Sequence, residues 1–336
     1  MIYYISEKIA NERTAGSKAR LDAEEIFKKR NYKEIKLNLI KCSPKNKIKL
    51  FFNLNKMLKN VKKDNYLVIQ YPLSPGYNFF LPYICKKYNV IFLIHDLYSL
   101  RMGNKLDSEI RQLKYSKFII AHNNTMISLL QKNGIKNTIL NLEVFDYLTD
   151  KENIYHHAND KESVCFSGNL AKSKFIYSFP KVLIEKGINL YGIGLENQKL
   201  QNGINYKGSY EPDIVHTMLK GRYGLVWDGN SSETCNGLMG EYLKYNNPHK
   251  ISMYIAAGMP IIIWEKAAEA DFVKKNKIGI SVASLNDIPK RISLITEEDY
   301  RNLIVNIVDL KKKITSGYYL NRQLSYFERE VLKLGE

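Results

Sequence analysis

Residues Tyr245–Ile262 read YNNPHKISMYIAAGMPII and combine three local signals in one stretch. A polar turn runs to Pro248, a mostly apolar segment of helix length follows, and Gly258 and Pro260 separate that segment from another apolar run. Glycine ends helices because it adopts a left-handed backbone readily, and proline does not continue a helix. The stretch therefore predicts a helix over 248–257 that leads directly into a strand, as in alternating α/β folds.

The first turn of this predicted helix carries two basic residues, His249 and Lys250. Positive charge at a helix N-terminus opposes the helix macrodipole, and an anion such as a diphosphate bound there would explain the placement. Lys250 is therefore our first candidate for a binding residue.

Outside this stretch, short apolar runs alternate with segments of helix length. We expect strands at 1–6, 66–71, 90–95, 118–121, 163–167, 188–193, 224–227, 260–264 and 279–282, and helices at 17–29, 48–61, 78–88 and 125–133. Apolar strands separated by helices indicate parallel βαβ units whose sheet is buried on both faces. The polar segment Asp150–Glu162 is the best linker candidate, so the chain predicts two successive doubly wound α/β domains.

The composition is that of an ordinary globular protein. The 336 residues are 45% hydrophobic and 25% charged, which excludes a disordered chain, a coiled coil and a collagen-like fibre. Apolar runs such as Val90–Ile94 last about five residues, against the roughly 18 that a membrane-spanning helix requires, and the N-terminus lacks the pattern of a secretory signal. Cys42, Cys85, Cys165 and Cys235 form no C-x-x-C pair, which favours a reducing cytoplasm and argues against structural zinc.

The charge balance is the unusual feature of the composition. Lys and Arg number 51 against 34 Asp and Glu, a formal net charge of +17. A basic surface can attract nucleic acid, anionic lipid or the phosphates of a nucleotide substrate. Abundant Lys, Asn, Ile and Tyr also fit simple compositional drift, and no arginine-rich stripe or nucleic-acid motif accompanies the charge. We therefore expect no nucleic-acid partner and leave peripheral association with a membrane open.

Parallel sheets bind ligands at the carboxyl ends of their strands. Polar residues at or after the end of a predicted strand are therefore candidates for binding or catalysis. Gly16 and Ser17 lie before the first helix, where small residues and exposed N–H groups make an anion site, although Ser17 also fits a simple helix cap. His95 and Asp96 lie at the end of the most apolar strand of the N-terminal half. Either can accept a proton from a hydroxyl group, although Asp96 also fits a helix cap and His95 a structural hydrogen bond.

Two further candidate groups lie in the C-terminal half. Gly168 and Asn169 open a loop in which Lys172 supplies positive charge, a pattern that an ordinary turn in a lysine-rich chain also gives. Tyr210 stands shortly before Pro212 and can stack on a base or ribose, or be buried without a functional role.

Several segments in fixed order resemble a known family. They are IHD (Ile94–Asp96), FSGNLAKSKF (Phe166–Phe175), INYKGSYEPDIV (Ile204–Val215), GLVW (Gly224–Trp227) and the pattern K-x-x-x-Y-x-A-A-G-x-P-[IV]-I that begins at Lys250. The set resembles the GT-B glycosyltransferases. More closely, it is similar to the bacterial glucosyltransferases that extend GlcNAc-modified serine-rich repeat adhesins, whose relatives include galactofuranosyltransferases.

The resemblance implies a GT-B fold, with two Rossmann-like domains facing a central cleft. These would be an acceptor-side domain at 1–155 and a UDP-sugar-binding domain at 156–318, with a C-terminal helix at 319–336 that crosses back to the first domain. The implied activity moves a hexose, glucose before GlcNAc or galactofuranose, from a UDP-sugar to a hydroxyl of a glycan acceptor, expected to be GlcNAc on a serine-rich repeat glycoprotein. The resemblance implies no metal and no other cofactor.

The resemblance also assigns site residues. The UDP moiety is expected to contact Gly168, Asn169, Lys172, Tyr210 and Lys250, with the loop at Gly16 and Ser17 near the phosphates. Lys172 stands where relatives can carry arginine, which weakens a bidentate phosphate contact. The glutamate pair of many retaining GT-B enzymes is not cleanly present, so retention or inversion of the anomeric centre stays open. Asp96 is our candidate base, with His95 next.

Three alternatives accompany this hypothesis. The first is a glycosyltransferase of capsular or exopolysaccharide synthesis with a lipid-linked acceptor, and the second is a non-enzymatic protein whose basic face binds an anionic surface. The third is a nucleotide-sugar epimerase or dehydrogenase, but the chain lacks the G-x-G-x-x-G fingerprint and a Tyr-x-x-x-Lys pair in a suitable context. We further expect a homo-oligomer, either a dimer or a tetramer. We expect it in the cytoplasm, with a place at the inner face of the membrane left open.

Overall fold

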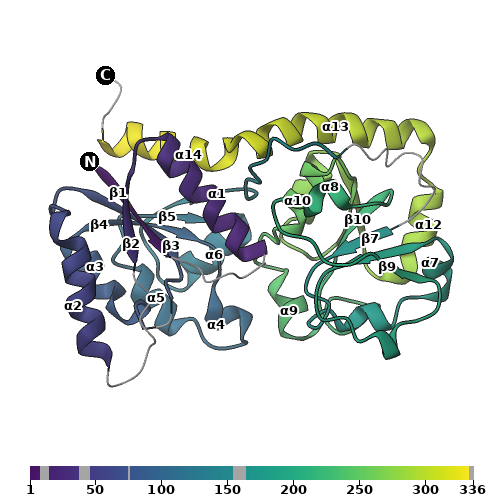
Figure 1. The fold of residues 1–336 in the computed structure, drawn as a ribbon, viewed down its shortest axis with the longest axis horizontal. Coiled ribbons are helices and arrows are strands. Elements are labelled where there is room, and N and C mark those ends of the chain that lie inside the picture. Colours follow the sequence, from purple (N-terminus) through teal and green to yellow (C-terminus); the bar gives the residue numbers. More distant parts are fainter. Residues whose placement is uncertain (8–14, 38–45, 75, 154–163, 333–336) are drawn as a thin grey trace. The chain divides into compact units, whose positions relative to one another are not determined.

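The computed structural model describes residues 1–7, 15–37, 46–74, 76–153 and 164–332. The chain forms two compact units, each built on its own sheet (Figure 1). The first unit comprises Met1–Glu12, Ala19–Leu142 and Leu320–Glu336, and the second comprises Arg13–Lys18 and Glu143–Tyr319. Each sheet has six strands, and all neighbouring strands are parallel. The prediction of two doubly wound α/β halves is confirmed.

The first sheet has the strand order β2-β1-β3-β4-β5-β6. Its strands are β1 (Ile2–Glu7), β2 (Lys33–Leu37), β3 (Tyr66–Tyr71), β4 (Asn89–Ile94), β5 (Phe118–Ala121) and β6 (Thr138–Asn141). The connecting helices are α1 (Ala15–Lys29), α2 (Lys47–Met57), α3 (Leu81–Lys87), α4 (Tyr98–Arg101), α5 (Asp107–Leu113) and α6 (Asn124–Lys132). In β3 and β4 five of six residues are buried, because helices cover both faces of the sheet centre.

The last helix, α14 (Tyr318–Leu332), packs mainly on this first unit. The centroid of the Phe327 ring lies 5.1 Å from that of Tyr66 and 5.4 Å from that of Phe118. Polar contacts accompany this packing. Glu328 accepts a 2.6 Å hydrogen bond from the Tyr32 hydroxyl and forms an ion pair with Arg30. The C-terminal helix therefore completes the apolar cover of the first sheet.

The second sheet has the strand order β12-β11-β10-β7-β8-β9. Its strands are β7 (Val164–Ser167), β8 (Ile188–Tyr191), β9 (Ile204–Tyr206), β10 (Tyr223–Val226), β11 (Ile261–Trp264) and β12 (Gly279–Val282). The helices are α7 (Lys181–Glu185), α8 (Val215–Met218), α9 (Gly237–Tyr242), α10 (Lys250–Ala256), α11 (Ala270–Lys275), α12 (Ile288–Ser293) and α13 (Glu297–Ser316). The predicted succession of helix, Gly258 and strand is present as α10, Gly258 and β11, with Gly258 at a φ of 75°.

The chain enters the second unit earlier than the expected domain boundary at 155. Ser252 donates a 2.7 Å hydrogen bond to the carbonyl of Phe145, and the Asn247 side chain donates one of 2.9 Å to the carbonyl of Glu143. The Tyr147 N–H donates to the carbonyl of Ile314 in α13. These bonds hold the segment from Glu143 onward to the second unit, while residues 154–163 of the expected linker lie outside the described residues.

Two sequence expectations concern the environment of the chain. Within the described residues, no helix is both long and apolar enough to cross a membrane. Cys85, Cys165 and Cys235 are buried thiols, and Cys42 lies outside the described residues.

A buried carboxyl group lies at the start of α11. Glu269 is 1% exposed, and its Oε2 has no hydrogen-bond partner among the described residues. Burial raises the pKa of Glu269 well above its usual range, and the nearby carboxylates of Glu143 and Asp271 raise it further. The folded protein therefore retains a proton on Glu269 that the unfolded chain releases.

This linkage gives a testable pH dependence. Because the folded pKa lies above the unfolded one, stability falls as pH rises from the ordinary carboxyl range to the raised folded pKa, by about 1.4 kcal/mol per pH unit within that window. Glu269→Gln removes the ionisation, so its free energy of unfolding should exceed that of the wild type increasingly as pH rises. Denaturant unfolding at a series of pH values measures the difference, and exposed Glu265→Gln serves as the control. Parallel pH profiles for wild type and Glu269→Gln would contradict the assignment.

Candidate active site

Helix α10 places Lys250 at the carboxyl edge of the second sheet. Tyr254, one turn further along the helix, is fully buried. Its hydroxyl accepts a 3.0 Å hydrogen bond from the N–H of Ser167 in β7 and donates one of 3.1 Å to the carbonyl of Leu225 in β10. Gly224 makes room for this ring, since an added Cβ there would lie 2.4 Å from it. The helix is thereby fixed across the two central strands of its sheet.

The Lys250 ammonium has defined neighbours on both of these strands. Its Nζ lies 2.9 Å from Oδ2 of Asp228, just after β10, and 5.0 Å from the centroid of the Phe166 ring in β7. Gly168 directly follows β7, and a Cβ added there would lie 3.1 Å from Cε of Lys250. Glycine therefore keeps the space beside the lysine open. The structure brings the predicted residues Gly168 and Lys250 together and adds Asp228, which we did not predict although it also follows a strand end.

The loops after β7, β8 and β9 are tied to one another. The N–H of Gly168 donates to the carbonyl of Tyr191, and the N–H of Gly192 donates to that of Gly208. A Cβ at Gly192, where φ is 137°, would lie only 1.8 Å from the carbonyl oxygen of Gly168, so only glycine fits this approach. The close interlocking gives the loop that begins at Gly168 a fixed backbone.

The remaining predicted residues of this edge lie in the same loops. Asn169 and Lys172 are exposed in the turn after β7, and the Lys172 N–H donates to the carbonyl of Asn169. Tyr210 follows β9 and is half-buried, with its ring centroid 6.2 Å from that of Tyr191. Among the described residues, no hydrogen bond or ring contact joins Tyr210 or Lys172 to Lys250.

His249 does not supply the positive charge that we expected beside Lys250. Burial, and after it the charge of Lys18, lowers the pKa of His249 to about 4, so its ring is neutral at pH 7. Its Nε2 lies 3.3 Å from the carbonyl oxygen of Asp146, and its ring stacks on Tyr147 with centroids 5.4 Å apart. His249 is a packing residue of the second unit, and Lys250 alone carries the charge of the pair.

The predicted loop at Gly16 and Ser17 forms the first turn of α1. This turn belongs to the second unit, whereas the helix from Ala19 onward belongs to the first. Ser17 is buried, and so is the next residue, Lys18. The Lys18 ammonium donates a 2.8 Å hydrogen bond to the carbonyl of Leu148 and lies 3.1 Å from Oδ1 of Asp213. A buried ammonium therefore accompanies the small residues of this turn, a feature that the residue pattern alone did not reveal.

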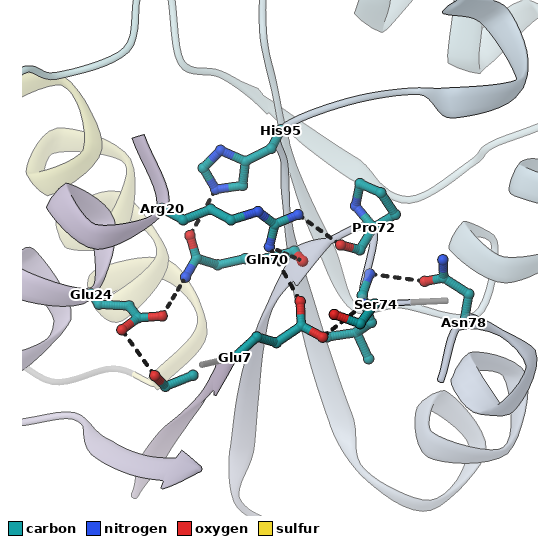
Figure 2. Close-up of polar contacts among 10 residues, drawn as sticks. Glu7, Arg20, Glu24, Gln70, Pro72, Ser74, Asn78 and His95 are labelled. Carbon is teal, nitrogen blue, oxygen red and sulfur yellow. Dashed lines mark hydrogen bonds and ion pairs between the residues drawn. The ribbon is translucent and has the colours of Figure 1, made fainter. Parts of the chain in front are cut away.

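A second polar group occupies the carboxyl edge of the first sheet (Figure 2). Arg20 of α1 donates hydrogen bonds of 3.0 and 2.7 Å to the carbonyls of Gln70 and Pro72, just at and after the end of β3. Its guanidinium also lies 3.7 Å from the Glu7 carboxylate at the end of β1, which accepts a 2.7 Å hydrogen bond from the N–H of Ser74. Arg20 thus joins the ends of β1 and β3. Neither Arg20 nor Glu7 was among the predicted residues.

His95 is held by a chain of hydrogen bonds from the same helix. Its Nε2 lies 2.7 Å from Oε1 of Gln70, and the Gln70 amide donates a 3.2 Å bond to Glu24, which also accepts a 2.9 Å bond from Ser6 (Figure 2). Because the amide group donates to the carboxylate, Oε1 of Gln70 must accept from His95. The proton of a neutral His95 therefore sits on Nε2, and Nδ1 is the unprotonated nitrogen.

Asp96, the next residue, has its two carboxylate oxygens in different surroundings. Oδ2 accepts a 2.7 Å hydrogen bond from Arg101, whereas Oδ1 is buried with no hydrogen-bond partner among the described residues. The carboxylate of Asp96 is therefore ion-paired with Arg101 through one of its two oxygens. The structure places both predicted proton acceptors at this edge, with Asp96 ion-paired and His95 oriented by Gln70.

A fold of two parallel α/β units, each with polar side chains at the carboxyl edge of its sheet, is typical of the GT-B glycosyltransferases. Residues 2–144 match the family model of the glucosyltransferase 3-like N-terminal domain, and residues 164–326 match that of the glucosyltransferase 3-like C-terminal domain. The chain belongs to this glucosyltransferase 3-like family. It is 32% identical over 331 residues to the β-1,6-galactofuranosyltransferase WbbI of Escherichia coli K12, covering 95% of this chain and 96% of that protein.

Solved structures share the fold at low sequence identity. The lipopolysaccharide outer core galactosyltransferase WaaB is 11% identical with a TM-score of 0.64, over 99% of both chains. The Anabaena protein Alr3699/HepE in complex with UDP is 10% identical with a TM-score of 0.63, over 98% of this chain and 100% of that one. The Anabaena protein has also been solved with UDP and glucose. The predicted GT-B fold and family are confirmed.

The Arg20 contacts give a stability prediction. Arg20→Met leaves the carbonyls of Gln70 and Pro72 without this donor and the buried Glu7 carboxylate without its cation, which should lower the free energy of unfolding by about 3–5 kcal/mol. Chemical denaturation followed by circular dichroism measures the loss.

A matched control lies on the same helix. Lys29 is exposed and only 3.9 Å from Glu25, so Lys29→Met should change the free energy of unfolding by less than about 1 kcal/mol. Equal, small losses for both variants would mean that Arg20 does not hold the strand ends together.

Proposed function

We propose that this protein transfers a hexosyl group from a UDP-sugar to a hydroxyl group of a glycan. The observation that carries the proposal is the Lys250 ammonium, which lies beside Gly168 and Asp228 at the carboxyl edge of the second sheet. An ammonium next to a position without a side chain suits a diphosphate, because phosphate oxygens can approach both the charge and the backbone. The UDP complex of the Anabaena protein and the name of the Escherichia coli relative support the nucleotide and the reaction class.

In the proposed reaction, the bond between the anomeric carbon of the sugar and the β-phosphate oxygen of UDP breaks. The acceptor oxygen forms the new bond to that carbon and gives its proton to a base, and UDP leaves with added negative charge. Lys250 stabilises this charge, with its ammonium shared between Asp228 and the diphosphate. The close approach of Gly192 to the Gly168 carbonyl fixes the backbone of this loop, so the site has one geometry before the nucleotide binds.

The other predicted residues take supporting roles in this proposal. Lys172 is exposed, so its side chain is available to add a second positive charge to the diphosphate, while Tyr210 offers a ring face to the uracil or ribose. The turn with Gly16 and Ser17 approaches the phosphates, and Asn169 shares the loop of Gly168. We further propose that the reaction needs no metal. Within the described residues, no group of three or more His, Cys, Asp or Glu side chains is placed to hold a metal ion.

We assign the acceptor to the first unit and the role of base to the His95–Asp96 pair. His95 is the better proton acceptor of the two, because Gln70 keeps its Nδ1 unprotonated while the Asp96 carboxylate is already ion-paired with Arg101. Asp96 stays paired with Arg101 next to this base in the sequence. Gln70 and Glu24 are positioning residues in this scheme.

We propose glucose or galactofuranose as the transferred sugar. The family model names a glucosyltransferase and the 32% identical relative is a galactofuranosyltransferase, so each name supports one of the two. GlcNAc on a serine-rich repeat glycoprotein and a lipid-linked glycan remain the two proposed acceptors. Comparing UDP-glucose, UDP-GlcNAc and UDP-galactofuranose for hydrolysis and transfer distinguishes the sugars.

The nucleotide site is tested by thermal unfolding with UDP in the presence of EDTA. Because UDP binds only the folded protein, it should stabilise the wild type, by about 2.7 kcal/mol at a hundredfold excess over Kd. Lys250→Ala should bind UDP at least about tenfold more weakly and lose about 10²-fold or more in turnover, since a charge contact to the leaving group is gone.

The control for this experiment is Lys275→Ala, which removes an exposed lysine from α11. It should leave UDP binding and turnover unchanged. A stabilisation by UDP that requires a divalent metal would refute metal independence, and a Lys250→Ala enzyme with full activity would refute the site.

The base is tested with His95→Gln and Asp96→Asn. His95→Gln should lower turnover by about 10²-fold or more with unchanged UDP affinity, because it removes the proton acceptor and not the nucleotide site. Gln70→Leu should lower turnover less and alter the pH dependence of kcat, since it frees the choice of His95 tautomer. Asp96→Asn should keep more activity than His95→Gln. The reverse order of the two losses, with normal melting of both variants, would make Asp96 the base.

A further inference from the structure

Helix α2 and the short helix that follows β3 carry large apolar side chains on their outer surface. Ile48 and Phe52 lie one turn apart on α2 and are 72% and 68% exposed, and Phe79 is 66% exposed. Lys47 connects the two elements, because its Nζ lies 4.8 Å from the centroid of the Phe79 ring. Single exposed apolar residues are ordinary, whereas three large ones in adjoining elements mark an interaction site.

The segment that contains this face is strongly basic. From Ile35 to Lys63 the sequence has nine lysines, no arginine and no acidic residue. At helical spacing, Lys56 and Lys59 continue the stripe that begins with Ile48 and Phe52, and Lys49 flanks it. The opposite side of α2 buries Leu50 and Leu54 in the core of the first unit. The helix is therefore held in place by its inner side and presents an apolar, cationic outer side.

We infer that this α2 face docks on the surface of an anionic lipid bilayer. The face consists of Lys47, Ile48, Lys49, Phe52, Lys56, Lys59 and Phe79. Its apolar side chains insert at the boundary of headgroups and acyl chains, and its lysines lie among the headgroup phosphates. The docking does not depend on the proposed transfer reaction.

Two features favour a bilayer over a nucleic acid. Ile48, at the start of the stripe, is aliphatic and 72% exposed, where a nucleic-acid site would have a further aromatic or polar group for the bases. All positive charge in this stretch comes from lysine, whose point charge suits headgroups, whereas arginine dominates the reading of bases. A bilayer uses both the apolar and the cationic parts of the face.

The test is co-sedimentation of the full-length protein with two kinds of vesicle, phosphatidylcholine alone and phosphatidylcholine with about a third phosphatidylglycerol. We expect binding to the anionic vesicles that weakens with salt. The triple variant Lys49→Gln, Lys56→Gln and Lys59→Gln should bind about a hundredfold more weakly, at about fivefold per lysine. The double variant Ile48→Ser and Phe52→Ser should lose about tenfold or more, since its apolar insertion is gone.

Control variants carry changes of the same kind on the second unit. Leu294 is 68% exposed, like Phe52, so Leu294→Ser controls for the apolar change. Lys181→Gln, Lys275→Gln and Lys290→Gln together control for the loss of charge at exposed sites. Both controls should bind the anionic vesicles like the wild type, and all variants should melt like it.

Three outcomes would overturn the inference. One is absence of binding to the anionic vesicles by the wild type, including the case in which the protein instead binds single-stranded RNA. Another is an equal loss in the lysine variants of both units, which would show charge attraction without a specific face. The third is unchanged binding of the Ile48→Ser and Phe52→Ser variant, which would show that the apolar side chains do not insert.

Discussion

The parallel arrangement of every strand pair is the constraint on which the rest of the structure depends. In a parallel sheet the carboxyl ends of all strands meet at one edge, so residues distant in sequence become neighbours there. In the second sheet this edge brings Gly168, after β7, and Asp228, after β10, to Lys250. In the first sheet it brings the ends of β1, β3 and β4 to the side chains of α1. The two edges give a glycosyltransferase one polar group in each unit.

The two groups are built in different ways. At the second sheet, packing positions the charge, because the buried Tyr254 ring fixes α10 and the lysine one turn earlier reaches between the strands. At the first sheet, hydrogen bonds do so, because Arg20 and Gln70 hold backbone carbonyls and the His95 ring in place. Each group also contains a carboxylate that is already ion-paired, Asp228 with Lys250 and Asp96 with Arg101. A bound diphosphate at the second sheet must therefore share its cation with a protein carboxylate.

Much of the fold was predictable because strands buried in a parallel sheet appear in the sequence as short apolar runs. The strands predicted at 66–71, 118–121 and 279–282 coincide with β3, β5 and β12. The unpredicted strands β2, β6 and β9 all lie at sheet edges. In β2 only Ile35 and Leu37 are buried, so its sequence KEIKL alternates with lysine and glutamate and carries no apolar run. A strand with one neighbour needs less apolar surface, and its signal in the sequence is correspondingly weak.

The site was predictable where a residue follows a strand, opens a helix or belongs to the family pattern. Gly168, Lys250, His95 and Asp96 were found in this way or by the family pattern. The role of Arg20 arises from contacts with carbonyls of a distant strand, which no local pattern shows. His249 was predicted to be a cation, but its burial beside Lys18 keeps the ring neutral, and burial is a property of the folded chain.

The central claim is that the edge of the second sheet around Lys250 holds the nucleotide. Hydrogen–deuterium exchange with and without saturating UDP tests it most directly, because it locates the bound ligand on the chain without relying on activity. We predict slower exchange with UDP in the peptides that cover 164–172 and 226–230, and unchanged exchange in those that cover 66–96. Protection confined to 66–96, or none at millimolar UDP, would contradict the claim.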